Sequence, residues 1–63
     1  MSKDTIDMIE IEIVKSEDAL NAIEMELMQE YPSYSELKRL ADEVIARGKR
    51  VRKAIKRDRK YFT

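Results

Sequence analysis

The chain has 63 residues, 41% of them charged and 43% hydrophobic, and contains neither cysteine nor histidine. This length allows one domain at most, and the composition excludes disulfides and the usual zinc-ligand sets. The net charge of zero hides a sorting by half: residues 1–31 carry nine acids and two bases (net −7), and residues 32–63 carry eleven bases and four acids (net +7).

No stretch of the sequence approaches the roughly 20 consecutive apolar residues that cross a bilayer. The chain opens directly on Lys3, Asp4 and further acids, which is not the pattern of a signal peptide. We therefore expect a cytoplasmic protein that does not bind a membrane. We expect neither a cofactor nor a small-molecule substrate.

The first half predicts one helix from about residue 4 to residue 30. Its apolar residues recur at alternating steps of three and four, as in the a/d seam of a coiled coil, with Ser16 as the one interruption. They are Ile6, Ile9, Ile13, Leu20, Ile23 and Leu27.

A strand over residues 8–14 is the alternative for this region, because Glu10-Ile11-Glu12-Ile13 alternates with a period of two. The order would then be strand–helix–helix, as in ribbon-helix-helix dimers, which read the DNA major groove with a two-stranded ribbon. Here Glu10 and Glu12 would face the phosphate-lined groove and be repelled, so this alternative does not favour DNA binding through the ribbon.

The turn is predicted at residues 31–34. Pro32 lacks an N–H and disfavours helical geometry at the preceding residue, so the first helix should end by about Glu30. Ser33-Tyr34-Ser35-Glu36 then matches a capping box, in which Ser33 accepts from the Glu36 amide and the Glu36 side chain bonds back to the Ser33 amide.

The second helix is predicted from about residue 35 to residue 60. Apolar and small residues fall on one face at helical spacing. They are Leu37, Leu40, Ala41, Val44, Gly48, Val51, Ile55 and Phe62. Gly48 costs roughly 1 kcal/mol of helix propensity relative to alanine, which predicts either the close approach of another helix or a bend.

These elements predict an all-α protein: residues 1–63 form a single domain, an antiparallel two-helix hairpin, that pairs into a four-helix bundle. The acidic first helix would lie along the basic second one. A core this small contributes only about 3–5 kcal/mol, so association with itself or with another protein is the expected source of further stability.

Catalysis is not expected. Histidine and cysteine are absent, and the few serines and threonines lie near helix caps or the terminus. The carboxylate pair Glu26 and Glu30 has helical i, i+4 spacing, which is typical of a solvated face. We therefore expect neither an enzyme nor a metal site.

A second apolar stripe on the first helix is the first candidate binding site. Ile11, Val14, Met25 and Met28 lie off the a/d seam, interrupted by Asp18 and Asn21. One hairpin seam cannot bury both stripes, and exposed apolar surface marks interfaces. The stripe would serve a homodimer, a protein partner, or both.

A basic run is the second candidate site. Nine bases fall within fourteen residues: Arg47, Lys49, Arg50, Arg52, Lys53, Lys56, Arg57, Arg59 and Lys60. The run could neutralise the first helix, bind an acidic protein, or contact nucleic-acid phosphates without reading sequence. The adjacent acidic half would compete with phosphate.

The function expected from these features is that of a small interaction protein, an adaptor or inhibitor that binds a larger protein through helix faces. Its size is similar to that of phage- or plasmid-encoded regulators, which is an analogy only. Nucleic-acid binding through the basic run is the alternative.

Overall fold

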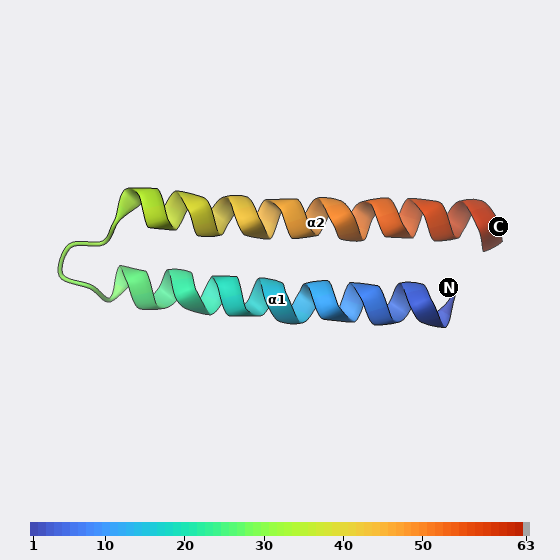
Figure 1. The fold of residues 1–63 in the computed structure, drawn as a ribbon, viewed down its shortest axis with the longest axis horizontal. Coiled ribbons are helices and arrows are strands. Elements are labelled where there is room, and N and C mark those ends of the chain that lie inside the picture. The colour runs from blue at the N-terminus through green and yellow to red at the C-terminus, as the bar shows by residue number, and fades with distance from the viewer. Residues whose placement is uncertain (63) are drawn as a thin grey trace.

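The computed structural model describes residues 1–62, with side chains described through residue 60. It consists of α1 (Lys3–Leu27) and α2 (Tyr34–Phe62), which lie side by side and run in opposite directions (Figure 1). The all-α hairpin predicted from the sequence is confirmed. The alternative strand is wrong, because residues 8–14 lie within α1 and the described chain contains no strand.

Ser2 caps α1, and its side chain accepts a hydrogen bond from the Thr5 amide at 3.2 Å. The helix ends at Leu27, three residues before the predicted end at residue 30. There the amides of Met28 and Gln29 donate to the carbonyls of Met25 and Glu26, three residues back, at 3.2 and 3.1 Å. These shorter-range bonds close the last turn and let the chain leave the helix early.

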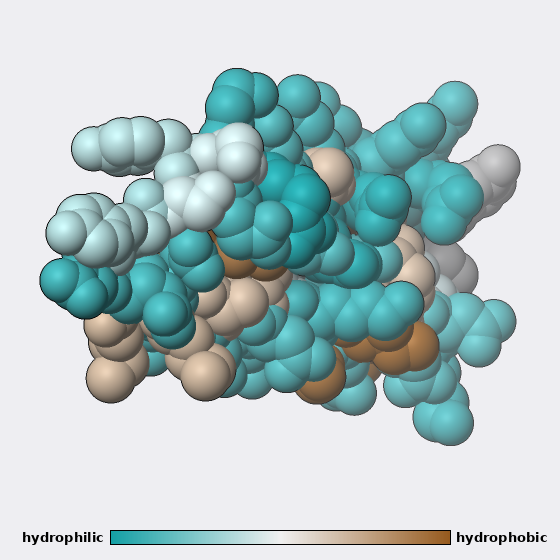
Figure 2. All heavy atoms as spheres, turned by 60° about the vertical axis from the view of Figure 1, so that its left-hand side comes forward, coloured by the Kyte–Doolittle hydropathy of each residue, from teal (hydrophilic) through white to brown (hydrophobic). Residues whose placement is uncertain are grey.

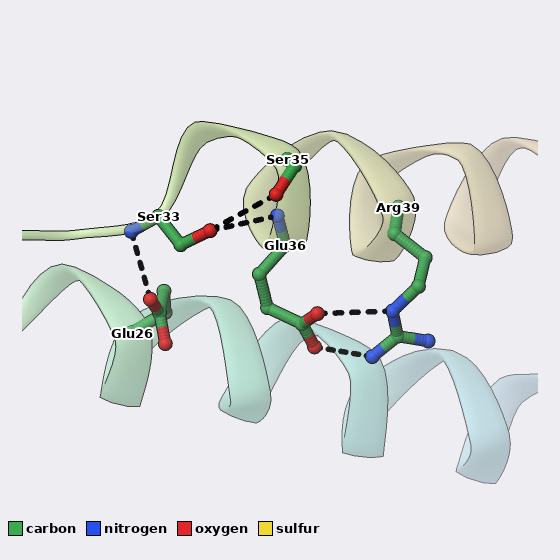
Figure 3. A network of polar contacts seen from close by, with 5 residues as sticks. All are labelled: Glu26, Ser33, Ser35, Glu36 and Arg39. Carbon is green, nitrogen blue, oxygen red and sulfur yellow. Dashed lines mark hydrogen bonds and ion pairs between the residues drawn. The ribbon is translucent and has the colours of Figure 1, made fainter.

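A polar network at the turn fixes the start of α2 (Figure 3). The Ser33 hydroxyl accepts from the Glu36 amide at 3.3 Å, as the sequence predicted. The reciprocal half of the capping box is wrong, because the Ser33 amide donates to Glu26 of α1 at 2.8 Å. Glu36 instead pairs with Arg39, one turn further along α2, and this hydrogen bond lowers the pKa of Glu36. The turn is therefore tied to α1 rather than closed on itself.

The seam between the helices differs from the predicted one by a small rotation. On α1, the residues at heptad spacing that are buried or half-buried are Thr5, Ile9, Glu12, Ser16, Ala19, Ile23 and Glu26. On α2 they are Leu37, Leu40, Val44, Arg47, Val51, Ala54 and Asp58. Ile6, Ile13, Leu20 and Leu27, which we placed in the seam, are exposed beside it.

The same correction applies to Ala41, Gly48 and Ile55 of α2, which are also exposed.

The hydrophobic core is consequently thin. Only Ala19, Leu40 and Ala54 are buried among the hydrophobic residues described, and two of them are alanines. Much of the chain's apolar surface is left outside the hairpin.

Candidate protein-binding surfaces

A polar cluster occupies the middle of the seam. Arg47 of α2 donates to Glu12 of α1 at 3.0 Å and to Glu43 on its own helix at 3.1 Å. The more exposed Arg50 lies 3.8 Å from the same Glu12 oxygen. The hydrogen bond to Glu12 is the main cause of the raised pKa of Arg47, followed by that to Glu43. This cluster joins the acidic and basic segments of the chain.

A second polar cluster lies at the open end of the hairpin. Asp58 of α2 is buried, and its carboxylate accepts from the Ser2 amide at 3.0 Å. The terminal amino group lies 3.9 Å away. The Ser2 amide lowers the pKa of Asp58 most, and the Thr5 and Ser2 hydroxyls and the amino terminus lower it further. The start of α1 is thus fixed against the far end of α2.

The first apolar surface lies beside the seam, and we call it the apolar face. It runs over both helices and consists of Ile6, Ile13, Leu20, Leu27, Ala41, Val44, Gly48, Val51 and Ile55. An open groove of about 350 Å³ runs along its centre, where Ile13 and Leu20 of α1 meet Val44, Gly48 and Val51 of α2. Glu17 also lines this groove, so an acidic side chain borders the face on the α1 side.

The second apolar surface is the outer stripe, defined as Ile11, Val14, Met25 and Met28. These side chains are 53%, 56%, 67% and 84% exposed, so the hairpin leaves all four in solvent. Ile11 and Val14 line a shallow depression together with Asp7, Glu10 and Lys15. Figure 2 shows apolar side chains, coloured tan and brown, along the lower edge of the molecule, on the side where α1 lies.

The residues of the basic run do not all lie on one surface of the hairpin. Arg47 is turned inward, with its side chain 15% exposed, and Arg50 lies near the same buried carboxylate. The remaining seven residues of the run are exposed on α2. Six of these make no ion pair with any residue in the described part of the chain: Lys49, Arg52, Lys53, Lys56, Arg57 and Lys60.

The apolar face was not predicted from the sequence, because most of its residues were assigned to the hairpin seam. A signal for the true seam was present in the charges. Glu12 and Glu26 lie two heptads apart on the α1 seam, and Arg47 and Asp58 both lie on the α2 seam, eleven residues apart. Glu12 and Arg47 carry opposite charges at the same level of the two antiparallel helices, which indicates a seam that contains polar residues rather than a wholly apolar one.

Among residues 1–62, no group of three or more acidic side chains is placed to hold a metal ion. Neither helix combines the length and hydrophobicity needed to cross a membrane. Comparison of the chain with known protein families, curated proteins and solved structures finds no match.

Proposed function

We propose that the protein is a small, non-catalytic interaction protein that binds a larger protein through the outer stripe of α1, acting in the cytoplasm as an adaptor or inhibitor. The observation that carries this proposal is the exposure of all four stripe residues, each more than half exposed. A single exposed hydrophobic residue is ordinary. Several along one helix are typical of an interface.

The chemistry around the stripe specifies the partner surface. Asp4, Asp7 and Asp18 are exposed on the same side of α1 as Ile11 and Val14. A helix with an apolar stripe and acidic neighbours fits an apolar groove with a basic rim, the arrangement in which one helix lies in the groove of another protein. Met25 and Met28 suit a surface that must adapt its shape, because methionine is unbranched and polarizable.

Stripe substitutions test the proposal directly. Ile11→Asp and Met25→Asp each place a charge in the stripe, while Ala46→Asp places the same charge at an exposed position of α2. A protein captured from the native cell by the wild-type chain is identified, purified and titrated against the three variants. We expect both stripe variants to bind at least about tenfold more weakly, as is typical of central interface positions.

The control Ala46→Asp should bind as the wild type does, and circular dichroism should show full helicity in all variants. Equal affinity for the wild type and both stripe variants would contradict the proposal. It would show that the captured protein binds elsewhere on the hairpin.

Nucleic-acid binding is the second candidate function. It is favoured by the six exposed bases of α2 that have no acidic partner in the described chain. These residues surround the outside of the second half of the helix, where phosphates could reach them. Such binding would depend steeply on salt, because each phosphate contact releases counterions.

Titration of labelled duplex and single-stranded nucleic acid at several salt concentrations tests this second function. Duplex binding should weaken with a log–log slope of about −0.9 per phosphate contacted. Lys53→Gln with Lys56→Gln should reduce both affinity and slope. The matched pair Lys3→Gln with Lys15→Gln, on the acidic helix, should leave both unchanged. No binding at low salt would exclude this function.

A further inference from the structure

The apolar face is uncovered in the hairpin, and its composition suits the interior of a larger bundle. Ile13, Leu20 and Ile55 are 48%, 50% and 43% exposed, so each side chain has one side against the seam and one side in solvent. Val44 and Val51, half-buried, form the floor between them. Residues that flank the seam of a helical pair in this way lie at the centre of a four-helix bundle.

We infer that a second copy of this chain covers the apolar face, with α1 of each copy packed against α2 of the other. The two copies are related by a two-fold axis parallel to the helices. This rotation exchanges the acidic and basic sides of the hairpin and keeps each residue at its own level along the bundle. Every helix then has antiparallel neighbours. The dimer uses a different surface from the outer stripe, which stays open for a foreign partner.

The dimensions of the hairpin fit such a dimer. Its Cα trace measures 50 by 15 Å in the plane of the two helices. One face is therefore about 750 Å² before side chains are added, close to the roughly 800 Å² per partner that stable interfaces bury. The apolar face occupies the central part of this area, and covering it supplies stability that the thin core lacks.

Charge selects the second copy as the occupant. Beyond the apolar face, α1 presents an acidic edge, Glu10, Glu17 and Glu24, which follow Ile6, Ile13 and Leu20 by four positions. Beyond the same face, α2 presents an edge on which Lys38 and Arg52 lie one heptad before and one heptad after the exposed Ile45, and we call it the basic edge. A copy turned about the proposed axis lays its basic edge along the acidic edge of the first, and the reverse contact forms by symmetry.

These charges are not used within the hairpin. Among the described residues, the side-chain ion pairs between the two helices are those of Glu12 with Arg47 and Arg50. Glu10, Glu17, Glu24 and Arg52 make no ion pair in this part of the chain, and Lys38 pairs only with Asp42 on its own helix. The net charges of −7 and +7 on the two halves of the sequence are therefore only partly neutralised by ion pairs within one hairpin.

The charges also discriminate between two ways of packing the same faces. A two-fold axis perpendicular to the helices would place α1 of one copy on α1 of the other, and the acidic edges would meet. The parallel axis instead brings Glu10 to the level of Arg52 of the second copy, and Glu24 to the level of its Lys38. These levels follow from the hairpin, where Glu12 lies level with Arg47 and Arg50.

Gly48 is consistent with this occupant. A Cβ atom at this position would meet nothing within 4 Å, so packing inside the hairpin does not require glycine. Gly48 lines the open groove, and Ala41 lies one heptad before it. These small residues leave a hollow on the α2 side of the face, where side chains of the second copy enter.

Charge reversal tests the arrangement. One variant carries Glu10→Lys and Glu24→Lys, a second carries Lys38→Glu and Arg52→Glu, and a third combines all four changes. We expect the wild type to sediment as a dimer. Each reversed edge should weaken the dimer by about tenfold or more at low salt, because four symmetric contacts change from attraction to repulsion. The combined variant should recover the dimer, since its edges are again complementary.

A thiol cross-link gives an independent readout, because the natural chain has no cysteine. A Glu10→Cys chain mixed with an Arg52→Cys chain should yield a covalent pair of unlike copies with a short bifunctional reagent. A preference for pairs of two Glu10→Cys chains would overturn the proposed axis.

Two results of the sedimentation experiment would overturn the proposal as a whole. One is a wild-type chain that is monomeric at every concentration, and the other is a dimer that neither edge reversal weakens.

Two further variants complete the test. Lys53→Glu with Lys60→Glu makes the same charge change at exposed positions of α2 that point away from the apolar face, and it should leave the dimer intact. Ile11→Asp, which disrupts the outer stripe, should also leave it intact. Loss of the dimer in Ile11→Asp would overturn the assignment of the dimer to the apolar face. The dimer can therefore fail while the proposed partner site stands, and the reverse also holds.

Discussion

Arg47 and Glu12 form a hydrogen-bonded ion pair at 3.0 Å in the middle of the helix seam, where a hairpin of this length would ordinarily bury two aliphatic side chains. Their side chains are 15% and 11% exposed. The Nε atom of Arg47 is buried and makes no hydrogen bond with any described residue. An incompletely satisfied pair of this kind adds little net stability. Its effect is to disfavour slipped or parallel pairings, which would leave each charge alone.

The first prediction tests whether the Glu12–Arg47 pair contributes to stability or only disfavours wrong pairings of the helices. Glu12→Leu alone should destabilise the hairpin, because it leaves Arg47 with only Glu43 in a partly dry site. Glu12→Leu combined with Arg47→Leu should restore or exceed wild-type stability, since an apolar pair carries no desolvation cost. Urea unfolding at a fixed chain concentration measures both. A double variant less stable than the single one would contradict this account.

The second prediction concerns the cap of α2. Ser33→Ala removes the acceptor for the Glu36 amide and should cost about 1 kcal/mol of unfolding free energy. Ser35→Ala is the matched control, because Ser35 is exposed and its one side-chain hydrogen bond among the described residues is to the Ser33 hydroxyl, at 3.1 Å. Its stability should stay close to that of the wild type. Equal losses in both variants would mean that the cap is not specific to Ser33.

The hairpin was predictable because its signals are local. Pro32 stops one helix, Ser33 caps the next, and the long apolar repeats on either side favour two paired helices, although the period-two alternation at residues 8–14 also allowed a strand. The earlier end of α1 was less accessible to sequence reasoning. It depends on Glu26 reaching the Ser33 amide across seven residues, a contact that exists only after the chain has reversed.

The rotation of the seam could not be read from hydrophobicity alone. The predicted and observed seams of α1 share Ile9, Ser16 and Ile23 and differ only in the alternate positions. Hydrophobicity favours Ile13 over Glu12, whereas the structure buries Glu12 and leaves Ile13 half exposed. The preference follows from Arg47, more than thirty residues away. The exposure of the outer stripe was predictable, because no rotation of α1 buries both of its apolar stripes in one seam.

The third prediction is a pH dependence that arises from Asp58. Its pKa in the folded chain is lowered, mainly by the Ser2 amide, so the unfolded chain takes up a proton first as the pH falls. The stabilisation by the ionised carboxylate is therefore complete above the ordinary aspartate pKa and is lost as the pH falls through the lowered value. Asp58→Asn should be less stable than the wild type at neutral pH.

Unfolding across the acidic range should show the two stability curves converging as the pH decreases. Asp42→Asn serves as the control, because Asp42 is exposed and pairs with Lys38 on its own helix. Its difference from the wild type should be small throughout. A constant gap between Asp58→Asn and the wild type from neutral to strongly acidic pH would contradict the assigned role of the carboxylate.

The fourth prediction is that Gly48→Ala changes folding and assembly in opposite directions. Alanine should stabilise the isolated hairpin by about 1 kcal/mol through helix propensity, since the added methyl meets no atom within 4 Å. If the hollow at Gly48 receives the second copy, the same methyl crowds the interface, and the dimer should dissociate at a higher concentration. Ala46→Gly, at an exposed position of α2, should lower helix stability by a similar amount and leave the dimer unchanged. Measuring both unfolding and sedimentation is therefore decisive: a Gly48→Ala chain that gains stability and dimerises as tightly as the wild type would place the second copy away from this hollow.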